Sequence, residues 1–226
     1  MAVVDMAQLI RMEKNDENLP YGVVISGVLK RGDSRYVMIR KRHAKDLIEN
    51  AVVATDSYSK TERIKHMYDG ISCVVETDIR KCIEKLDASE CDAVFVLLED
   101  IKAARLHNSF LYRYTIMDYG ECVPVHGAGV YAMLTKGKKE AVRTARELSH
   151  KSTAECFEIE DDIISRVMQN VYVKTCDVYA RISSDRLEIY ADVTGNRGRI
   201  RVNERGTFVN KNLIITKIVD RISKSM

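Results

Sequence analysis

The sequence predicts an α+β fold of two similar halves, each an antiparallel sheet with helices on one face. The first observation is a pattern that occurs twice, at 71–96 and at 156–181: a strand, an acidic helix cap, an amphipathic helix, and a Cys-Asp pair that opens another strand. The second is a strand of the form Tyr-x-Met-apolar-x-Lys before a basic helix, at 36–41 and at 131–136. Such repetition indicates a duplicated architecture. Chance similarity between two ordinary strand–helix units is the alternative.

The first elements follow from local patterns. Apolar side chains on one face predict a short helix over 5–13, and apolar, β-branched runs predict strands over 23–29 and 35–40. Turn residues at 30–34 separate these strands, so we expect a hairpin.

The rest of the first half contains the first copy of the repeated pattern. Apolar residues spaced by three and four positions predict a helix over 44–51. Residues 54–70 are polar and irregular, with at most a helical turn over 64–68. Thr77 or Asp78 is suited to cap the helix that follows, because its side chain can accept bonds from the first helical amides. The remaining expected elements are a helix over 79–86 and strands over 93–98 and 109–117.

Residues 118–129 concentrate three glycines and a proline, which marks a boundary between halves. We therefore expect a helical segment over 1–20, a first half over 21–125 and a second half over 126–226. The second half is expected to contain a strand at 130–135, a helix at 138–148, the second copy of the pattern, and strands at 186–193, 198–202 and 213–218.

Composition excludes several classes of protein. The longest apolar runs are about six residues, against about 20 needed to span a bilayer, and the first residues lack a secretory signal pattern. The 6 cysteines include no Cys-x-x-Cys pair, so we expect structural thiols in a reducing compartment, cytoplasm or nucleus. No metal site and no cofactor are expected.

Catalytic motifs are weak. The loop His126-Gly127-Ala128-Gly129 precedes a strand rather than a helix, so a connecting turn is favoured over a phosphate or catalytic site. The acidic groups at 99–100 and 160–162 are interpreted as helix caps rather than as metal or acid–base groups. We therefore expect that the chain is not an enzyme.

The predicted helices carry an excess of basic residues, in a chain of formal net charge +3. If all of them lie on one side of a sheet, they form a positive surface that suits phosphates. An ordinary solvated helix face is the alternative. The candidate nucleic-acid-binding residues are Lys41, Arg42, Lys45, Lys81, Lys85, Lys138, Lys139, Arg143 and Arg146.

The two copies, extended to 71–117 and 156–202, resemble the strand, helix and strand-meander unit of the sliding-clamp family typified by proliferating-cell nuclear antigen. The resemblance implies a clamp-like duplication whose helices line a ring, with Lys81, Lys85, Lys139, Arg143 and Arg146 facing DNA. It also implies that 118–129 is the interdomain connector. Two features depart from the family: 54–70 lacks the strand meander, and the chain is mildly basic, which favours a monomeric, viral-type factor over a closed ring.

Three hypotheses follow. The leading one is a non-enzymatic, clamp-like DNA-binding protein, a processivity factor or an accessory factor of replication or transcription, with double-stranded DNA and a polymerase as partners. The alternative is a cellular or viral structural or assembly protein that forms a homo-oligomer through the sheet edges of its two halves. The third is an enzyme with its site between the halves, near His126.

Overall fold

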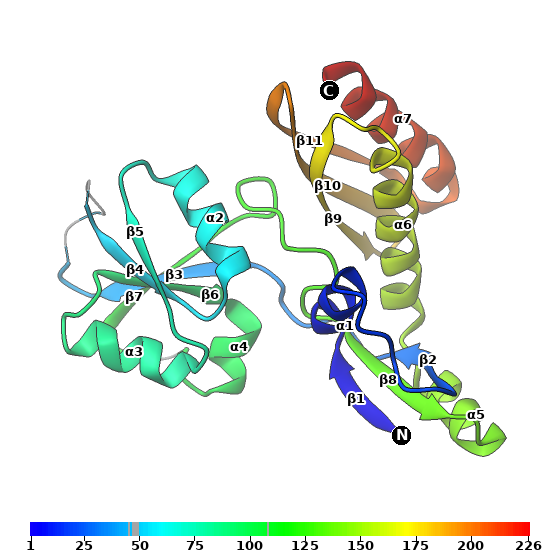
Figure 1. Cartoon of the computed structure of the whole chain (residues 1–226), viewed down its shortest axis with the longest axis horizontal. Helices are drawn as coiled ribbons and strands as arrows, with labels where there is room; N and C mark the ends of the chain where they lie inside the picture. The colour runs from blue at the N-terminus through cyan, green and yellow to red at the C-terminus, as the bar shows by residue number, and fades with distance from the viewer. Residues whose placement is uncertain (45, 47–49, 108) are drawn as a thin grey trace. The chain divides into compact units, whose positions relative to one another are not determined.

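The computed structural model describes residues 1–44, 46, 50–107 and 109–226. The chain is of the α+β class and forms two compact units (Figure 1). Unit 1 comprises Met1–Gly32 and Val123–Met226, and unit 2 comprises Asp33–Cys122. The division expected from the sequence, into 1–20, 21–125 and 126–226, stays a prediction beside this grouping. No helix among the described residues has the length and apolar character needed to cross a membrane.

Unit 2 is built on a five-stranded sheet in the order β5-β4-β6-β3-β7. Its strands are β3 (Tyr36–Lys41), β4 (Val52–Thr55), β5 (Ser72–Val75), β6 (Ala93–Leu97) and β7 (Tyr112–Ile116). Strand β4 is parallel to both β5 and β6, whereas β3 is antiparallel to β6 and β7. The expected purely antiparallel sheet is therefore wrong for this unit. The physical reason is that helices connect β4 to β5 and β5 to β6, and such crossovers join parallel strands.

Among the residues that the structure describes, three helices cover this sheet: α2 (Tyr58–Met67), α3 (Ile79–Asp87) and α4 (Leu98–Ala103). Helices α3 and α4 pack on the face that presents Val37, Val94 and Val96. Alternation along the strands turns Tyr36 and Phe95 to the opposite face. Helix α2 lies there, since the Arg63 guanidinium is 5.7 Å from the centre of the Tyr36 ring.

The first copy of the repeated pattern is confirmed. Strand β5, helix α3 and strand β6 follow in the expected order, and the Asp78 carboxylate caps α3 by accepting a bond from the Arg80 amide. Residues 54–70 are not irregular, however, because they contain the end of β4 and all of α2. The helix expected over 44–51 falls largely on residues 45 and 47–49, outside the described residues.

Unit 1 contains a three-stranded antiparallel sheet in the order β1-β8-β2. Its elements are β1 (Ala2–Asp5), α1 (Met6–Lys14), β2 (Val23–Val28), β8 (Tyr131–Lys136) and α5 (Lys139–Leu148). The expected hairpin over 23–40 is wrong, because β2 pairs with β8 whereas β3 belongs to the sheet of unit 2. Residues between β2 and β3 thus lead from one unit into the other.

A second antiparallel sheet of unit 1 has the order β11-β10-β9 and packs against two helices. Its elements are α6 (Lys151–Val167), β9 (Val173–Ser183), β10 (Arg186–Gly195), β11 (Gly198–Thr207), a 3-10 turn (Phe208–Asn210) and α7 (Lys211–Ser225). The core between them is aliphatic, with Ile163 of α6, Ile218 of α7 and Leu187 of β10 fully buried.

The second copy of the pattern differs from its expected structure. Residues 156–159 were expected to be a strand and 160–162 a helix cap, but both lie inside α6. Similarly, 213–218 belongs to α7 and is not a strand. Buried residues recur every three or four positions in both helices, at Cys156, Ile159 and Ile163 of α6 and at Ile215, Ile218 and Ile222 of α7. This helical period outweighs the β-propensity of the isoleucines. The duplication of two similar halves is therefore not confirmed.

Candidate functional site

The best-defined polar site lies in unit 2, at the edge of the sheet where β4 and β6 end. These strands are adjacent and parallel, so their carboxyl ends meet at one edge. The chain leaves β4 toward β5 on one side and leaves β6 toward β7 on the other. Such a divergence is where open α/β sheets form their ligand crevices.

The segment after β4 builds one wall of this site. Thr55 is the last residue of β4, Asp56 follows it, and Ser57 precedes the first turn of α2. The Ser57 side chain does not cap the helix, and the first turn, Tyr58 to Lys60, carries no acidic residue. The amides at the start of an α-helix have no helical acceptor, and they favour an anionic group.

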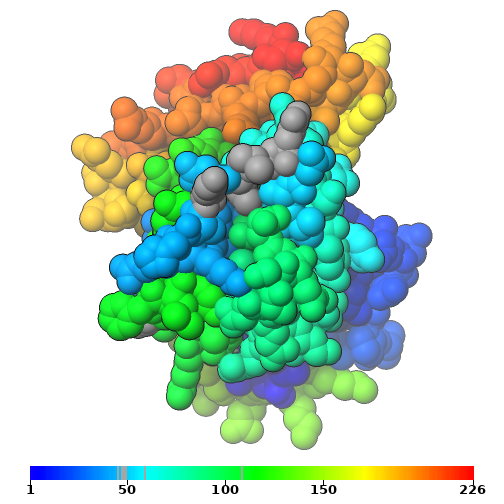
Figure 2. Space-filling model, turned by 90° about the vertical axis from the view of Figure 1, so that its left-hand side faces the viewer, coloured from blue at the N-terminus to red at the C-terminus, as the bar shows by residue number. Residues whose placement is uncertain are grey.

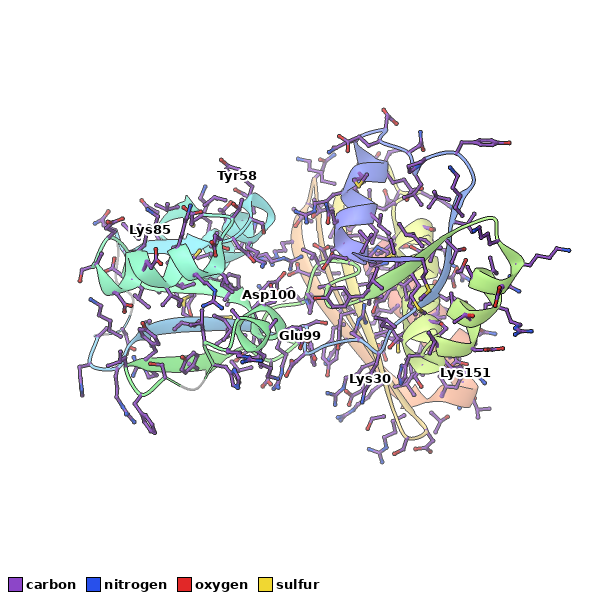
Figure 3. All side chains as sticks on the ribbon, turned by 90° about the horizontal axis from the view of Figure 1, so that it is seen from below. Lys30, Tyr58, Lys85, Glu99, Asp100 and Lys151 are labelled. Atoms are coloured by element: carbon purple, nitrogen blue, oxygen red, sulfur yellow. The ribbon has the colours of Figure 1, made fainter. Side chains whose placement is uncertain are left out.

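A lysine held by two carboxylates forms the centre of the site. The Lys60 amine lies 2.5 Å and 2.7 Å from the two Asp56 carboxylate oxygens and 3.7 Å from Asp100 Oδ2. The Lys60 side chain is 7% exposed, Asp56 is 17% exposed and Asp100 is 37% exposed. Tyr58, Glu99 and Asp100 lie at one end of unit 2, away from Lys85 (Figure 3). The Lys60 amine thus lies between the carboxylates of Asp56 and Asp100.

A buried hydroxyl lies beside this cluster. Thr55 is fully buried, and within the described residues its Oγ1 has no hydrogen-bond partner. Thr55 pairs with Phe95 of β6, so both side chains point to the face that α2 covers. An unsatisfied buried hydroxyl costs about 1–3 kcal/mol. A polar group of a ligand or an ordered water is the usual partner for such an atom.

Unit 1 contains a second polar cluster, which is satisfied internally. The two Arg31 amino groups lie 2.5 Å and 2.8 Å from the Glu160 carboxylate oxygens, and the Ala180 amide donates to the same carboxylate at 2.7 Å. The Arg31 guanidinium also lies over the Tyr179 ring, 4.7 Å from its centre. Burial alone would lower the pKa of Arg31, but the Glu160 carboxylate raises it above its ordinary value. This geometry ties the segment after β2 to α6 and β9.

His126 lies near that cluster as a packed side chain. Its ring stacks on Phe157 at 4.8 Å, and its Nε2 is 3.6 Å from Asp161 Oδ1. Burial lowers the pKa of His126, although Glu160, Asp161 and Asp177 oppose this shift. The following Gly127 has φ +78°, and a Cβ there would lie 2.8 Å from Ile10 Cδ1. The loop thus has a structural reason for its glycine, as a connecting turn requires.

Burial also determines the protonation state of three cysteine thiols. It raises the pKa of Cys156 to about 11, of Cys82 to about 12 and of Cys176 to about 12. These three groups are therefore neutral thiols at neutral pH and are not activated nucleophiles.

The helical residues predicted to bind nucleic acid lie on helices that cover different sheets. Lys81 and Lys85 lie on α3, whose outer side is turned to the viewer in Figure 2. Lys138, Lys139, Arg143 and Arg146 lie at the start of α5 or on it, and α5 packs on the β1-β8-β2 sheet. The premise that all these helices cover one sheet is wrong. Whether these residues contact nucleic acid stays a prediction.

The other candidates lie at the end of β3. The Lys41 amine donates to the Asp87 carbonyl at 2.9 Å and to Ser89 Oγ at 2.8 Å, and Arg42 donates to the Phe110 carbonyl at 3.2 Å. These bonds give both side chains a local structural role. Lys45 lies outside the described residues.

Sequence reasoning did not select Thr55, Asp56 or Lys60, and it assigned the 99–100 pair to a cap. The available signal was an apolar run at 51–54 followed directly by Thr-Asp-Ser, the composition of a strand end and a helix start. Asp100 does lie in the first turn of α4, as a cap-region acid would, but it also reaches Lys60.

Comparison with known proteins shows related sequences. Residues 11–144 match the family described as porphobilinogen deaminase, dipyromethane cofactor binding domain. Porphobilinogen deaminase of Chlorobium luteolum is 24% identical over 192 residues, covering 83% of this chain and 60% of the relative. Probable porphobilinogen deaminase of Picrophilus torridus is 23% identical, covering 75% of this chain and 61% of the relative. Porphobilinogen deaminase of Clostridium acetobutylicum is 23% identical, covering 76% and 60%.

These matches overturn the expected function. The resemblance to sliding clamps is wrong, and so are the DNA-clamp hypothesis and its assembly-protein alternative. The expectation of a non-enzymatic protein is also wrong, because the relatives are enzymes. The clamp resemblance depended on the second copy of the pattern, whose expected strand and helix cap at 156–162 lie inside the single helix α6. The chain spans about 60% of the length of the curated relatives it matches. With more than half of its residues matched, the chain belongs to the porphobilinogen deaminase family, in its dipyromethane cofactor-binding domain.

Proposed function

We propose that this chain binds pyrroles of the porphobilinogen type at the carboxyl edge of the unit 2 sheet, as part of a tetrapyrrole-forming enzyme. The observation that carries the proposal is the family match, which includes the whole of unit 2. The site geometry supports it, because the cluster around Lys60 lies at the divergence point of the sheet, where open α/β folds bind ligands.

The chemistry of the ligand class sets what the site must do. Porphobilinogen is a pyrrole with two carboxylate arms and one aminomethyl group, and a dipyromethane contains two linked pyrrole rings. Such a ligand needs donors for its carboxylates, an apolar surface for its rings and exclusion of competing water.

The residues present fit a group of this kind. The start of α2 offers amides without helical acceptors, and the buried Thr55 hydroxyl lacks a partner within the described residues. The Lys60 amine supplies a positive charge, and the Tyr58 ring is 80% exposed at the first position of α2, where it can cover a flat ring. These residues would hold a dipyromethane or a porphobilinogen unit. When bound, a dipyromethane supplies an electron-rich pyrrole end to which a further pyrrole can be joined.

The roles of these residues differ. The α2 amides and Lys60 bind and orient a carboxylate arm, and Asp56 keeps the amine in place through its two short contacts. Thr55 donates its hydroxyl proton to the ligand. A donor already fixed by its neighbours loses little entropy when the ligand binds.

Isothermal titration calorimetry with porphobilinogen tests the proposal on the full chain. Thr55→Val should weaken binding about tenfold, the effect of one lost hydrogen bond, while the unliganded protein should unfold at the same or a higher temperature. The matched control is Thr115→Val, because Thr115 is exposed on β7 of the same sheet. Absence of porphobilinogen binding, or equal binding by both variants and the unchanged protein, would contradict the proposal.

Intact-mass spectrometry gives a second readout that does not depend on turnover. Protein purified from cells that make porphobilinogen should retain a pyrrole-derived mass more often than the Thr55→Val variant does. The partners and the compartment of the protein stay predictions. They are a homo-oligomer, DNA or a polymerase as partner, and a reducing compartment.

A further inference from the structure

The connection between α6 and β9, in unit 1, carries a group of exposed apolar side chains. Val171 is 85% exposed, Tyr172 is 55% exposed and Met168 is 44% exposed. Met168 follows the last residue of α6, and Val171 and Tyr172 directly precede β9. A single exposed apolar side chain is ordinary on a protein surface, whereas a group of them marks an interaction site. We call these three residues the apolar tip.

The turn between β10 and β11 holds the backbone of this tip. The Asn196 amide donates to the Tyr172 carbonyl at 2.9 Å, and the Tyr172 amide donates to Asn170 Oδ1 at 3.0 Å. A Cβ at Gly195 would lie 2.5 Å from the Tyr172 carbonyl oxygen, so the turn and the tip are in close contact. Both segments lie at the end of unit 1 that is uppermost in Figure 1. The backbone of the tip is thus fixed while its side chains face solvent.

The tip is flanked by basic residues. Neither the connection from α6 to β9 nor the turn from β10 to β11 contains an acidic residue. Lys174 on β9 and Arg197 in the turn are both exposed, and neither forms an ion pair within the described part of the chain. The next acid on β9, Asp177, is half-buried and accepts a bond from the His126 amide at 3.2 Å.

Two further acids of the adjoining elements are paired with arginines. Asp192 on β10 is 4% exposed and lies 2.6 Å from Arg199 Nε and 3.3 Å from Arg201 Nε. Asp162 on α6 lies 2.8 Å from Arg166 Nε. Because the acids are paired or partly buried while several cations reach solvent, this end of unit 1 presents positive charge around an apolar centre.

The shape and the charge of this surface favour one kind of partner. A side chain that is 85% exposed protrudes, so a protein partner would need a matching pocket, whereas a lipid bilayer accepts it without one. A tyrosine suits the bilayer interface, because its ring is apolar and its hydroxyl is polar. Anionic headgroups attract lysine and arginine near the bilayer surface.

We propose that the apolar tip inserts into the surface of an anionic lipid bilayer, with Lys174 and Arg197 facing the headgroups. The contact is peripheral and reversible, because three side chains bury little apolar area and no segment crosses the bilayer. It involves unit 1 alone and does not depend on the pyrrole site proposed for unit 2.

Flotation of the full chain with lipid vesicles tests the role of the apolar side chains. One set of vesicles is phosphatidylcholine alone, and the other is equimolar phosphatidylcholine and phosphatidylglycerol. The apolar variant carries Val171→Ser and Tyr172→Ser. Its matched control carries Val209→Ser and Tyr21→Ser, which removes the same two side-chain types from positions that are 92% and 98% exposed. Melting temperatures confirm that each variant is folded.

A second pair of variants tests the role of charge. The charge variant carries Lys174→Glu and Arg197→Glu. Its matched control carries Lys139→Glu and Arg146→Glu, which changes the net charge equally at exposed positions on α5.

The unchanged chain should float with the mixed vesicles and remain in solution with phosphatidylcholine alone, and added salt should weaken its binding. The apolar variant should bind the mixed vesicles about tenfold more weakly, because two apolar side chains no longer leave water. The charge variant should lose about as much, because two attractions to headgroups become repulsions. Both controls should bind as the unchanged chain does.

Three results would overturn the proposal. The first is a failure of the unchanged chain to bind the mixed vesicles. The second is an equal loss of binding in a variant and its matched control. The third is concentration-dependent self-association without lipid that the apolar variant abolishes, since the tip would then be an interface between copies of this chain. Size-exclusion chromatography with light scattering measures that association.

Discussion

The buried pair of Arg31 and Glu160 is the interaction whose loss should be most costly in unit 1. The Glu160 side chain is 0% exposed and that of Arg31 is 9% exposed. Replacing Glu160 by Gln keeps the shape but leaves the Arg31 guanidinium as an uncompensated buried charge. Breaking a buried ion pair in this way costs about 3–5 kcal/mol.

The magnitude can be divided between charge and hydrogen bonds. Glu160 accepts two bonds from Arg31 and one from the Ala180 amide. Gln can still accept the Ala180 bond through its carbonyl oxygen, whereas its amide nitrogen cannot accept from Arg31. We therefore expect Glu160→Gln to lower the free energy of unfolding by about 3 kcal/mol, at the lower end of that range.

Urea denaturation followed by far-ultraviolet circular dichroism measures this loss, with Glu158→Gln as the control. Glu158 is exposed on the same helix, α6, so its replacement changes the net charge equally without uncovering a buried group. The double variant Arg31→Met with Glu160→Met should lose less than Glu160→Gln alone, because it removes both charges. Equal stability of Glu160→Gln and Glu158→Gln would refute the reasoning.

Three further predictions concern His126, Gly127 and the cysteines. Burial holds the pKa of His126 below its ordinary value of 6.5, so the unfolded chain takes up a proton first as the pH falls. The free energy of unfolding should therefore fall from pH 7.5 to 5.5, and His126→Gln should reduce this slope; an unchanged slope would contradict it. Gly127→Ala should lower the melting temperature more than Gly22→Ala. Both glycines have positive φ, but only at Gly127 would the added Cβ lie 2.8 Å from Ile10 Cδ1. Equal shifts of the melting temperature would exclude a steric contribution. Cys73 should react with a maleimide before Cys156 and Cys176. The latter two are buried, and burial raises their pKa values to about 11 and about 12. Peptide mass spectrometry gives the order of reaction.

Local patterns identified most elements correctly, but not how they pair. The periods at 5–13, 79–86 and 138–148 predicted α1, α3 and α5, because each helix presents one apolar stripe to a sheet. The pairing of β2 with β8 could not be predicted, since more than a hundred residues separate these strands and turn residues between β2 and β3 suggested a hairpin. The isoleucines of α7 were misinterpreted because a β-branched run is compatible with both a short strand and a buried helix face.

The site around Lys60 lies largely in residues 54–70, where the sequence pattern was least informative. The burial of helix α2 explains why this segment was not recognised as a helix. Helix α2 turns Lys60, Thr61 and Arg63 inward, each less than 10% exposed, so the face it buries is largely polar. A helix of this kind shows no clear apolar period, and its polar composition is typical of a loop. Burying such groups costs free energy unless partners are supplied, and Asp56 and Asp100 supply them for Lys60. Buried polar groups at the end of a strand are therefore more costly than the apolar residues a fold would need there. This free-energy cost is consistent with polar residues retained for binding. In this segment the sign of a site is therefore a helix without an apolar period.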